Sequence, residues 1–365
     1  MTSETVYRVL ETSGYQLFCS QIILSSVTEM PSKVKDGCIY QYKNCKILWN
    51  HRLVQEDLWV REGKILNPEK LFFDEQAYAD VQIDCQGCII APGYIDVQIN
   101  GAFGIDFTET EDICSGLQTV SKGLLEHGVT SFCPTIITSP KQTYHRVIPK
   151  VQKCNGSKNG AGILGHSSAD LVTGETAINN GACMITHLFN AMVSYHHRDP
   201  HLIGVLTSTH IDEGRPLYYG LIADGIHTHP SALRLAQRVH TKGLVLVTDA
   251  ISAMGLPTGE HWLGNQKIEV KGKQATIAGT ETLCGSIAKL DYCVRNLLKN
   301  TGCGEVLALE SASLHPAKML GITDRKGTLD YDTDADFTIL DQALNVMATY
   351  IAGEQVWNSG LLVGL

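Results

Sequence analysis

The sequence predicts an α/β protein with a central region of parallel βα units and a small β-sandwich built from both ends of the chain. Between residues 89 and 249, apolar runs typical of β-strands alternate with helical patterns, as they do in parallel βα units. Short period-two runs with glycines at their turns flank this region on both sides. Two histidines, His166 and His187, each end an apolar run, which is where α/β barrels present metal ligands.

Length and composition limit the classes of protein that this chain can belong to. The 365 residues suit one large domain plus a smaller one, and 44% of them are hydrophobic, enough for a sizeable core. No run approaches the roughly 18 apolar residues of a membrane span. The formal charge of −9 argues against nucleic acid or an anionic membrane as the main partner. An anionic substrate therefore needs local Arg, His and backbone N–H groups.

The cysteines and the N-terminal residues predict a cytoplasmic protein. The 12 cysteines have no regular spacing and no signal peptide precedes them, which favours reduced thiols. Cys85 and Cys88 form a lone CxxC pair without a second ligand pair, so we interpret them as ordinary thiols. Residues 1–38 form an extension that the sequence specifies poorly, and polar residues interrupt its apolar run at 15–27.

Six apolar runs are the predicted strands of the central region: residues 89–99, 128–137, 161–165, 182–187, 217–223 and 244–249. Pro230 precedes a predicted helix over residues 231–240, and an amphipathic pattern over residues 287–299 ends just before Gly302. Residues 267–278 predict an inserted hairpin. A closed (β/α)₈ barrel needs eight strands, so this region predicts an incomplete TIM-barrel-type domain.

The domain boundaries follow from these patterns. Residues 39–88 and 325–365 contain the short β-type runs and predict one composite β-sandwich domain. Residues 89–324 are then the (β/α) barrel catalytic domain.

Three strand ends carry side chains suited to hydrolysis. His166 and His187 can each bind a divalent ion as a neutral imidazole, although a single histidine in such a place is more often a core residue. Asp249 closes the strand at 244–249. Its carboxylate either caps the next helix or serves as general base for a metal-bound water, whose pKa the ion lowers to about 7.

Other polar residues lie in the loops that follow the strands. His227 comes after a turn at Gly225 and can donate a hydrogen bond to a substrate carbonyl or its oxyanion. The run His196-His197-Arg198 is either a solvated basic patch or an anion site in which Arg198 binds a phosphate. Residues 282–286 precede a helix and offer backbone groups to a polar ligand.

Together these segments resemble the N-acetylglucosamine-6-phosphate deacetylases of the amidohydrolase superfamily. The resemblance extends from about residue 46 to the C-terminus and is carried by residues 91–101, 128–132, 165–167, 186–192, 223–227 and 247–250. Thr-His-Leu-Phe-Asn-Ala-Met at 186–192 is the most specific of these motifs.

The resemblance implies a TIM barrel with a composite β-sandwich, and hydrolysis of N-acetyl-D-glucosamine 6-phosphate to D-glucosamine 6-phosphate and acetate in amino-sugar catabolism. It implies one divalent metal ion, zinc or similar, on His166 and His187, with Asp249 transferring the proton and His227 as the second catalytic residue. It also implies a homodimer, in which Arg198 reaches the phosphate across the interface. The substrate contacts that it implies are Asn190, Ala191, Arg198, Asp224, Gly225, Ile226, His227, Leu283, Cys284 and Gly285.

Gln98 and Asn100 stand where many amidohydrolases carry a His-x-His pair. Their presence favours a single-metal site and argues against a third interpretation, an amidohydrolase that acts on a cyclic amide.

The chain departs from the family pattern near residue 165. The family has a His-x-Glu-Gly-Pro motif after its third strand, and the Glu is a metal ligand. Here residues 161–165 begin like that strand and continue into 166–170, which resemble the segment after the fifth. We therefore predict an internal deletion that removes the acid ligand, together with the end of strand three, strand four and most of strand five.

Changing even a residue that orients a metal ligand costs about 10- to 100-fold in metal affinity or activity, so losing a ligand should cost more. We expect this form to be unstable or weakly active. The alternative is a catalytically impaired splice-type variant that acts only as a binding or dimerising partner.

Overall fold

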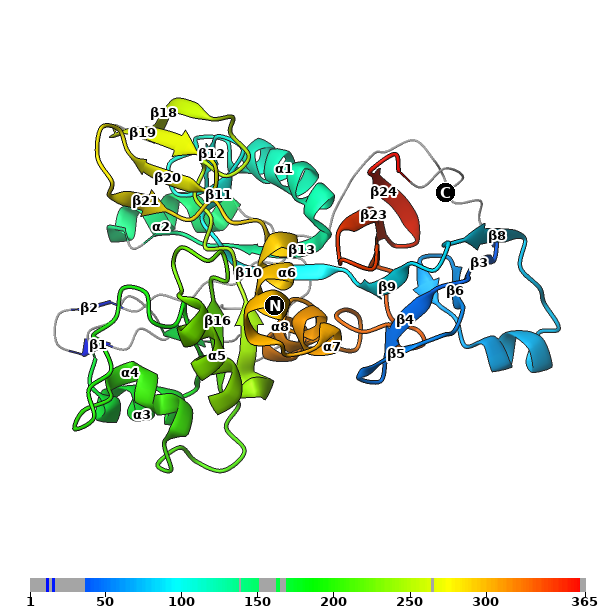
Figure 1. Cartoon of the computed structure of the whole chain (residues 1–365), viewed down its shortest axis with the longest axis horizontal. Coiled ribbons are helices and arrows are strands. Elements are labelled where there is room, and N and C mark those ends of the chain that lie inside the picture. Colours follow the sequence, from blue (N-terminus) through cyan, green and yellow to red (C-terminus); the bar gives the residue numbers. More distant parts are fainter. Residues whose placement is uncertain are drawn as a thin grey trace, which may run out of the picture.

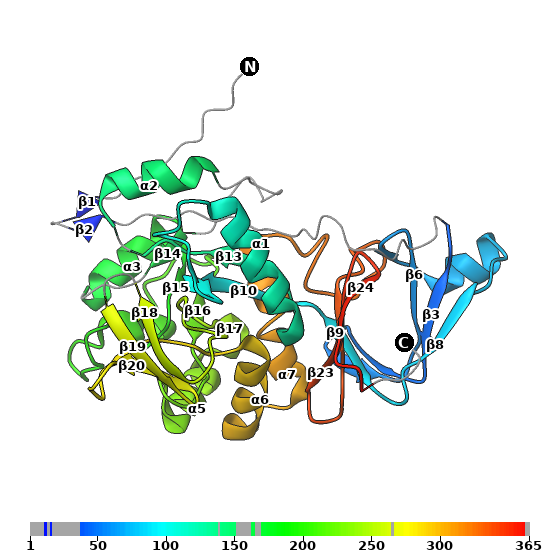
Figure 2. The same cartoon turned by 90° about the horizontal axis from the view of Figure 1, so that it is seen from above.

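The computed structural model describes residues 37–137, 139–150, 169–263 and 266–361, and describes the backbone alone at 11–12, 15–16 and 162–164. Figure 1 shows a barrel-like region with its helices on one side of the molecule and a β-rich region, formed by the blue and red ends of the chain, on the other. The two regions meet where β9 continues into β10. The short hairpin of β1 (Glu11–Thr12) and β2 (Tyr15–Gln16) lies beside the barrel-like region in both views (Figures 1 and 2).

The six predicted strands form the central parallel sheet. Their spatial order is β13 (Val129–Pro134), β10 (Tyr94–Ile99), β17 (Leu244–Leu246), β16 (Tyr218–Leu221), β15 (Ala182–Ile185) and β14 (Gly162–Leu164). β10 and β17 do not pair along their lengths, and β13-β10 and β17-β16-β15-β14 are separate ladders. The two strands meet at a seam at the end of β10 and just beyond the end of β17, made by a parallel bridge between Ile99 and Ala250 and by a 2.8 Å hydrogen bond from the Asp249 N–H to the Gln98 carbonyl.

The sheet is open at one place. In the part of the chain that the structure describes, β13 pairs only with β10 and β14 pairs only with β15, so these two strands form free edges. A closed barrel has no free edges and needs eight strands. The predicted incomplete barrel is confirmed, and the opening lies where two further strands would complete the ring.

The helices cover the outside of this sheet. They are α1 (Ile113–Leu124), α2 (Lys141–Val147), α3 (Leu171–Asn179), α4 (His201–Gly204), α5 (Pro230–Val239), α6 (Leu290–Thr301), α7 (Glu305–Glu310) and α8 (Leu314–Leu320). Short helical turns are η1 (Lys70–Asp74), η2 (Leu125–His127), η3 (Ile148–Lys150), η4 (Val205–Thr207) and η5 (Thr241–Gly243). Asp112 and Asp170 cap α1 and α3 with their side chains, and Gly302 ends α6 in the left-handed conformation. No helix in the described residues is long and apolar enough to cross a membrane.

Helix α6 begins three residues later than the sequence predicts. Ser286 bridges Ala250 in parallel, and its carbonyl accepts a hydrogen bond of 2.9 Å from the Ile251 N–H. The chain before α6 is therefore kept extended, although its apolar pattern fits a helix.

The predicted inserted hairpin is the centre of a small antiparallel sheet. Its strands are β18 (Gly259–Leu263), β19 (Gln266–Lys271), β20 (Gln274–Ile277) and β21 (Leu283–Gly285). Ile268, Val270 and Ala275 pack with Ile251, which follows β17 closely in the chain. This sheet therefore lies over the ends of the central strands, together with the short pair β11 (Gly101–Ala102) and β12 (Ile105–Asp106).

Both ends of the chain build the β-sandwich, as the sequence predicts, although the exact domain boundaries stay a prediction. One sheet has the order β24 (Glu354–Asn358), β23 (Val346–Ile351), β22 (Phe337–Leu340), β9 (Ile89–Pro92), β4 (Lys46–Trp49) and β5 (Arg52–Val54). The other has the order β7 (Lys64–Ile65), β6 (Leu58–Arg61), β3 (Tyr40–Lys43) and β8 (Val81–Asp84). Tyr42, Phe337 and Tyr350 pack between them, and Cys45, Cys85 and Cys88 are free thiols in the same core.

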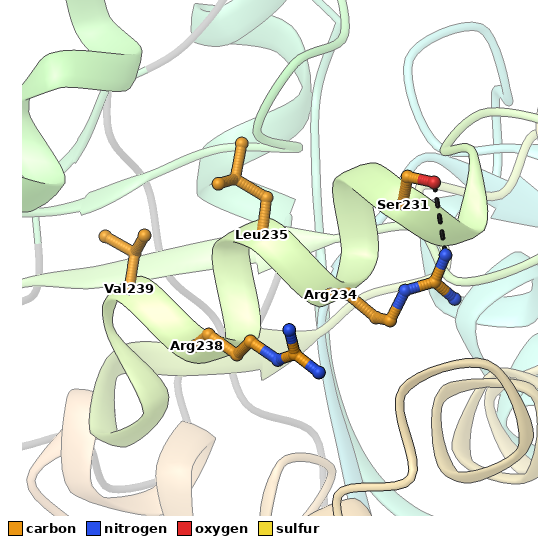
Figure 3. Close-up of a pocket in the computed structure, with 5 residues that line it drawn as sticks. All are labelled: Ser231, Arg234, Leu235, Arg238 and Val239. Carbon is orange, nitrogen blue, oxygen red and sulfur yellow. Dashed lines mark hydrogen bonds between the residues drawn. The ribbon is translucent and has the colours of Figure 1, made fainter.

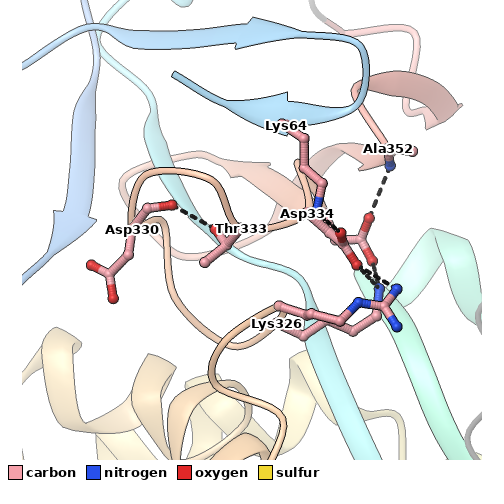
Figure 4. A network of polar contacts seen from close by, with 8 residues as sticks. Lys64, Lys326, Asp330, Thr333, Asp334 and Ala352 are labelled. Carbon is pink, nitrogen blue, oxygen red and sulfur yellow. Dashed lines mark hydrogen bonds and ion pairs between the residues drawn. The ribbon is translucent and has the colours of Figure 1, made fainter. Parts of the chain in front are cut away.

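A buried ion pair lies where the chain crosses from the β-sandwich to the barrel region, and it stabilises that segment (Figure 4). The ammonium of Lys326 bonds the carboxylate of Asp336 and lies 3.4 Å from that of Asp334. Lys326 is 7% exposed and Asp336 is 5% exposed. The Asp336 carbonyl accepts a 2.9 Å hydrogen bond from the N–H of Gly93, the residue between β9 and β10.

We predict that Lys326→Met destabilises the protein by about 3–5 kcal/mol, because it leaves a buried carboxylate without its counter-charge. Urea unfolding followed by circular dichroism measures this change. Arg325→Met is the matched control. It removes another partner of Asp334, but Arg325 is 41% exposed, so the expected cost is about 0–1 kcal/mol. Equal losses in the two variants would contradict the prediction.

Candidate active site

The predicted catalytic side chains meet at the carboxyl ends of the parallel strands. Gln98 lies near the end of β10, and His187, Asp224 and Asp249 follow β15, β16 and β17. Because parallel strands end at one edge of a sheet, residues distant in sequence converge there. Hydrogen bonds connect all four of these strands or the segments that directly follow them.

Asp249 is held by two amide side chains from the first strand. Its Oδ1 atom accepts a hydrogen bond of 2.8 Å from Gln98 Nε2 and one of 2.9 Å from Asn100 Nδ2. Its backbone has φ +48°, a left-handed conformation that is uncommon for a residue with a side chain. The two donors fix Oδ1 in place, so Oδ2 is the oxygen that can accept a proton.

Asp224 orients His227. The Asp224 Oδ2 and His227 Nδ1 atoms are 2.6 Å apart, and Asp224 Oδ1 accepts 2.8 Å hydrogen bonds from the N–H groups of Ile226 and His227. Gly225, at φ +79°, allows this tight turn. Since Nδ1 is bonded to Asp224, the remaining ring nitrogen, Nε2, is the one available to a substrate. Contact of residues 224–227 with a sugar stays a prediction.

The same pairing changes the pKa values of both groups. Burial alone would lower the pKa of His227, but the hydrogen bond and charge of Asp224, helped by the charge of Asp249, raise it above the ordinary value. Burial would raise the pKa of Asp224, but the hydrogen bonds from His227 and the backbone N–H groups lower it. The pairing therefore favours the protonated imidazole of His227 and the charged carboxylate of Asp224.

A third carboxyl group lies beneath the site. Burial, opposed by hydrogen bonds from Thr248 and Gln98, raises the pKa of Asp96 to about 7. The Thr248 hydroxyl donates to Asp96 at 2.5 Å. Asp96 is fully buried, so it supports the two strands that carry Gln98 and Asp249 and does not contact a ligand.

The turn after β15 has an unusual backbone. His187, Phe189 and Ala191 have φ values of +25°, +78° and +50°, although none of them is glycine. Such conformations cost on the order of 1–3 kcal/mol each and cluster at functional sites. Two hydrogen bonds hold the turn, from the Leu188 N–H to the Gly220 carbonyl at 2.8 Å and from the Asn190 N–H to the His187 carbonyl at 2.9 Å.

The described side chains fit a divalent metal ion only in part. His187 is a buried imidazole at a strand end, as predicted. His166 and the predicted junction near residue 165 lie outside the described residues. Within the described ranges, no three His, Cys, Asp or Glu side chains gather in a way that could hold a metal.

The other predicted substrate residues divide into two groups. Leu283, Cys284 and Gly285 form β21, and the bridge between Ala250 and Ser286 places the end of that strand next to Asp249. Arg198 is exposed in the loop after residue 192, and no hydrogen bond or ion pair between described residues joins it to Asp249 or His227.

The main residues that the sequence did not assign to the site are the partners of Asp249. In the sequence, Gln98 and Asn100 stand out only as replacements for a His-x-His pair, although two polar residues at alternate positions on an apolar strand are a signal of a shared polar face. Thr186 and Thr135, which bond these amides, carried no separate signal.

A shallow hollow on the outer face of α5 is a different feature of the surface (Figure 3). Ser231, Arg234, Leu235, Arg238 and Val239 line it, and Arg234 donates to Ser231 at 3.1 Å. None of the predicted catalytic or substrate residues contributes to it.

Comparisons with known proteins agree on one family. A profile described as the amidohydrolase family matches residues 156–356, more than half of the chain. An N-acetylglucosamine-6-phosphate deacetylase from Danio rerio is 50% identical, over 90% of this chain and 100% of the relative. The protein of that name from Homo sapiens is 47% identical, over 88% and 96%. A crystal structure of such a deacetylase from Pasteurella multocida has a TM-score of 0.76 at 23% identity, covers 87% of this chain and 99% of its own, and supports the fold alone.

The length of one alignment bears on the predicted deletion. The Danio rerio comparison runs over 402 positions, 37 more than the 365 residues of this chain, so at least that many positions of the relative have no counterpart here. This excess agrees with an internal deletion, whose position near residue 165 stays a prediction.

We predict that Asp224→Asn lowers the pKa of His227, because it removes the charge that favours the imidazolium. A titration of the histidine ring protons by NMR measures the change and needs no turnover. Asp212→Asn is the control, since Asp212 is exposed and its only ion pair among the described residues is with Arg215. An unchanged pKa of His227 in the first variant would contradict the assignment.

The same pair predicts how stability depends on pH. The pKa of His227 is above its ordinary value of 6.5, so its contribution to the stability of the fold is complete below about 6.5 and is lost as the pH rises through the folded pKa. The pKa of Asp224 is below its ordinary value of 3.8, so its contribution to stability is present above that value and is lost as the pH falls through the folded pKa. Urea unfolding as a function of pH should show both losses diminished in Asp224→Asn.

Proposed function

This chain belongs to the N-acetylglucosamine-6-phosphate deacetylases of the amidohydrolase family, and we propose that it hydrolyses N-acetyl-D-glucosamine 6-phosphate to D-glucosamine 6-phosphate and acetate, a step of amino-sugar catabolism. The names of the relatives support the substrate. The observation that supports the chemistry is the Asp249 carboxylate, oriented by Gln98 and Asn100, whose charge helps to raise the pKa of His227.

In amide hydrolysis Asp249 transfers the proton and His227 stabilises the developing oxyanion. Asp249 accepts a proton from the attacking water through Oδ2, while the water oxygen forms a bond to the acetyl carbon. His227 donates a hydrogen bond from Nε2 to the carbonyl oxygen, where negative charge develops. As the C–N bond breaks, Asp249 returns the proton to the leaving amine. General acid–base catalysis supplies about 10²–10⁴ in rate, and one oxyanion donor about 10²–10³.

We include in the proposal one divalent metal ion, zinc or similar, held by His166 and His187. Enzymes of the amidohydrolase family generally depend on divalent metals. A bound ion supplies Lewis acidity toward the carbonyl and lowers the pKa of water. Two imidazoles without an anionic ligand bind such an ion weakly.

The remaining assignments concern the substrate and the assembly. Backbone groups of Asn190 and Ala191, at the strained turn after β15, contact the sugar. Arg198 binds the phosphate across a homodimer interface, which accounts for its exposure in one chain. Residues 224–227 and 283–285 line the sugar on the other side, next to Asp249. We assign the enzyme to the cytoplasm.

We predict that the purified chain, with Zn²⁺ or Co²⁺ added, releases acetate from N-acetylglucosamine 6-phosphate more slowly than the Danio rerio relative. The expected difference in rate exceeds about 10- to 100-fold. The reason is the predicted loss of the carboxylate ligand, which should cost more than losing a residue that only orients a ligand. Acetate release and metal content by mass spectrometry measure the two quantities on the same sample.

Asp249→Asn is the control for the proposed chemistry and should remove the remaining activity. Failure of the unaltered chain to release acetate at saturating metal would overturn the proposed function. Turnover equal to that of the relative, with one tightly bound metal per chain, would instead overturn the predicted loss of a ligand.

A further inference from the structure

Two threonine hydroxyls bond the amide groups that hold Asp249. The hydroxyl of Thr186 donates to Gln98 Oε1, and the hydroxyl of Thr135 donates to Asn100 Oδ1 at 2.7 Å. Each amide thus directs its oxygen to a threonine and its nitrogen to Asp249. Two series of hydrogen bonds, each running from a threonine through an amide to the carboxylate, therefore converge on one oxygen atom, Oδ1 of Asp249.

The chemistry of these groups allows only one arrangement of the amides. An ionised carboxylate accepts hydrogen bonds but cannot donate them, so the nitrogen of each amide must face Asp249. The amide oxygen then points away and needs a donor, since an unpaired buried acceptor costs free energy. Thr186 and Gln98 are 5% and 7% exposed, so water does not readily replace this contact.

The two series of hydrogen bonds come from different strands. Thr186 directly follows β15, which β16 and β17 separate from β10, whereas Thr135 directly follows β13, which pairs with β10. Both lead to Oδ1 of Asp249, and no donor in the described residues is paired with Oδ2. The carboxylate therefore has one oxygen fixed by the protein and one left for a proton.

We propose that Thr186 and Thr135 are positioning residues, which act through Gln98 and Asn100 to hold the Asp249 carboxylate in the orientation that proton transfer requires. This inference rests on the deacetylation proposed above. It adds two side chains, Thr186 and Thr135, to the catalytic arrangement, and neither touches the substrate in this role.

Thr186 could act on the predicted metal ligand next to it and not on Asp249, so the two roles must be distinguished. Thr186 precedes His187, so its loss can also disturb the predicted metal ligand. Thr135 has no such neighbour, and its only side-chain hydrogen bond in the described residues is to Asn100. Equal behaviour of the two threonines therefore identifies their common target, Asp249.

The kinetic test compares Thr186→Val and Thr135→Val, which remove the hydroxyl at nearly constant volume, with Thr186→Ser and Thr135→Ser, which keep it. For the valine variants we expect kcat to fall about 10- to 100-fold with KM changed by less than about threefold, as for other residues that orient catalytic groups. Melting temperature and bound metal should stay unchanged, and the serine variants should recover most of kcat. Unchanged kcat in both valine variants, or no recovery with serine, would overturn the proposal.

A second measurement does not depend on turnover. In protein labelled with ¹⁵N at Gln and Asn, the side-chain NH₂ signals of Gln98 and Asn100 are assigned by their loss in Gln98→Glu and Asn100→Asp. Thr186→Val should shift the first pair, Thr135→Val the second, and Asp249→Ala both. If the unaltered chain releases no acetate, the proposed function fails, while these shifts still support the chains of hydrogen bonds. NH₂ signals of Gln98 and Asn100 that do not shift in the valine variants would overturn the proposed hydrogen bonds from the threonines.

Discussion

The seam between β10 and β17 is the contact on which the candidate site depends. These strands are about 150 residues apart in the sequence, and they meet through the Asp249 N–H on the Gln98 carbonyl, the bridge of Ile99 with Ala250, and the side chains of Gln98 and Asn100 on Asp249. Backbone pairing and side-chain bonding at the seam involve the same residues. The register of the two strands therefore fixes the place of the carboxylate, and a slip of one residue would turn Asp249 away from both amides.

The opening in the sheet lies away from this seam. The free edges are β13 and β14, whereas Asp249, Asp224 and His187 follow three consecutive paired strands, β17, β16 and β15. Asp249 and His227 can thus be held by intact pairing, even though the described strands do not close into a ring. What the opening removes is the part of a barrel from which the resemblance expects the acid metal ligand. Loss of metal affinity and retention of the hydrogen-bonded carboxylate are therefore compatible in one chain.

Most of the architecture could be predicted from periodicity, because each strand and helix carries its own pattern. The six central strands, α5 and the sandwich of both chain ends are examples. The site was predicted only as far as its strand-end residues. That Asp224 bonds His227, and that Gln98 and Asn100 bond Asp249, depends on turn geometry and on strands that are distant in sequence. The positive φ values at His187, Phe189, Ala191 and Asp249 were also unpredictable, since these residue types rarely adopt them and only surrounding hydrogen bonds keep them there.

The charges of Asp249 and His227 are linked in a way that suits amide hydrolysis. The negative charge of Asp249 is one of the reasons why the pKa of His227 is raised. In the proposed mechanism Asp249 takes the proton of the attacking water, that charge disappears, and the protonated imidazole of His227 becomes a stronger acid. In that mechanism His227 is then a stronger hydrogen-bond donor at the moment when charge develops on the carbonyl oxygen, and a donor that strengthens in the transition state contributes to rate and not only to binding. The hydrogen bond and charge of Asp224 favour the proton on the imidazole, so that His227 stabilises the oxyanion without giving its proton away.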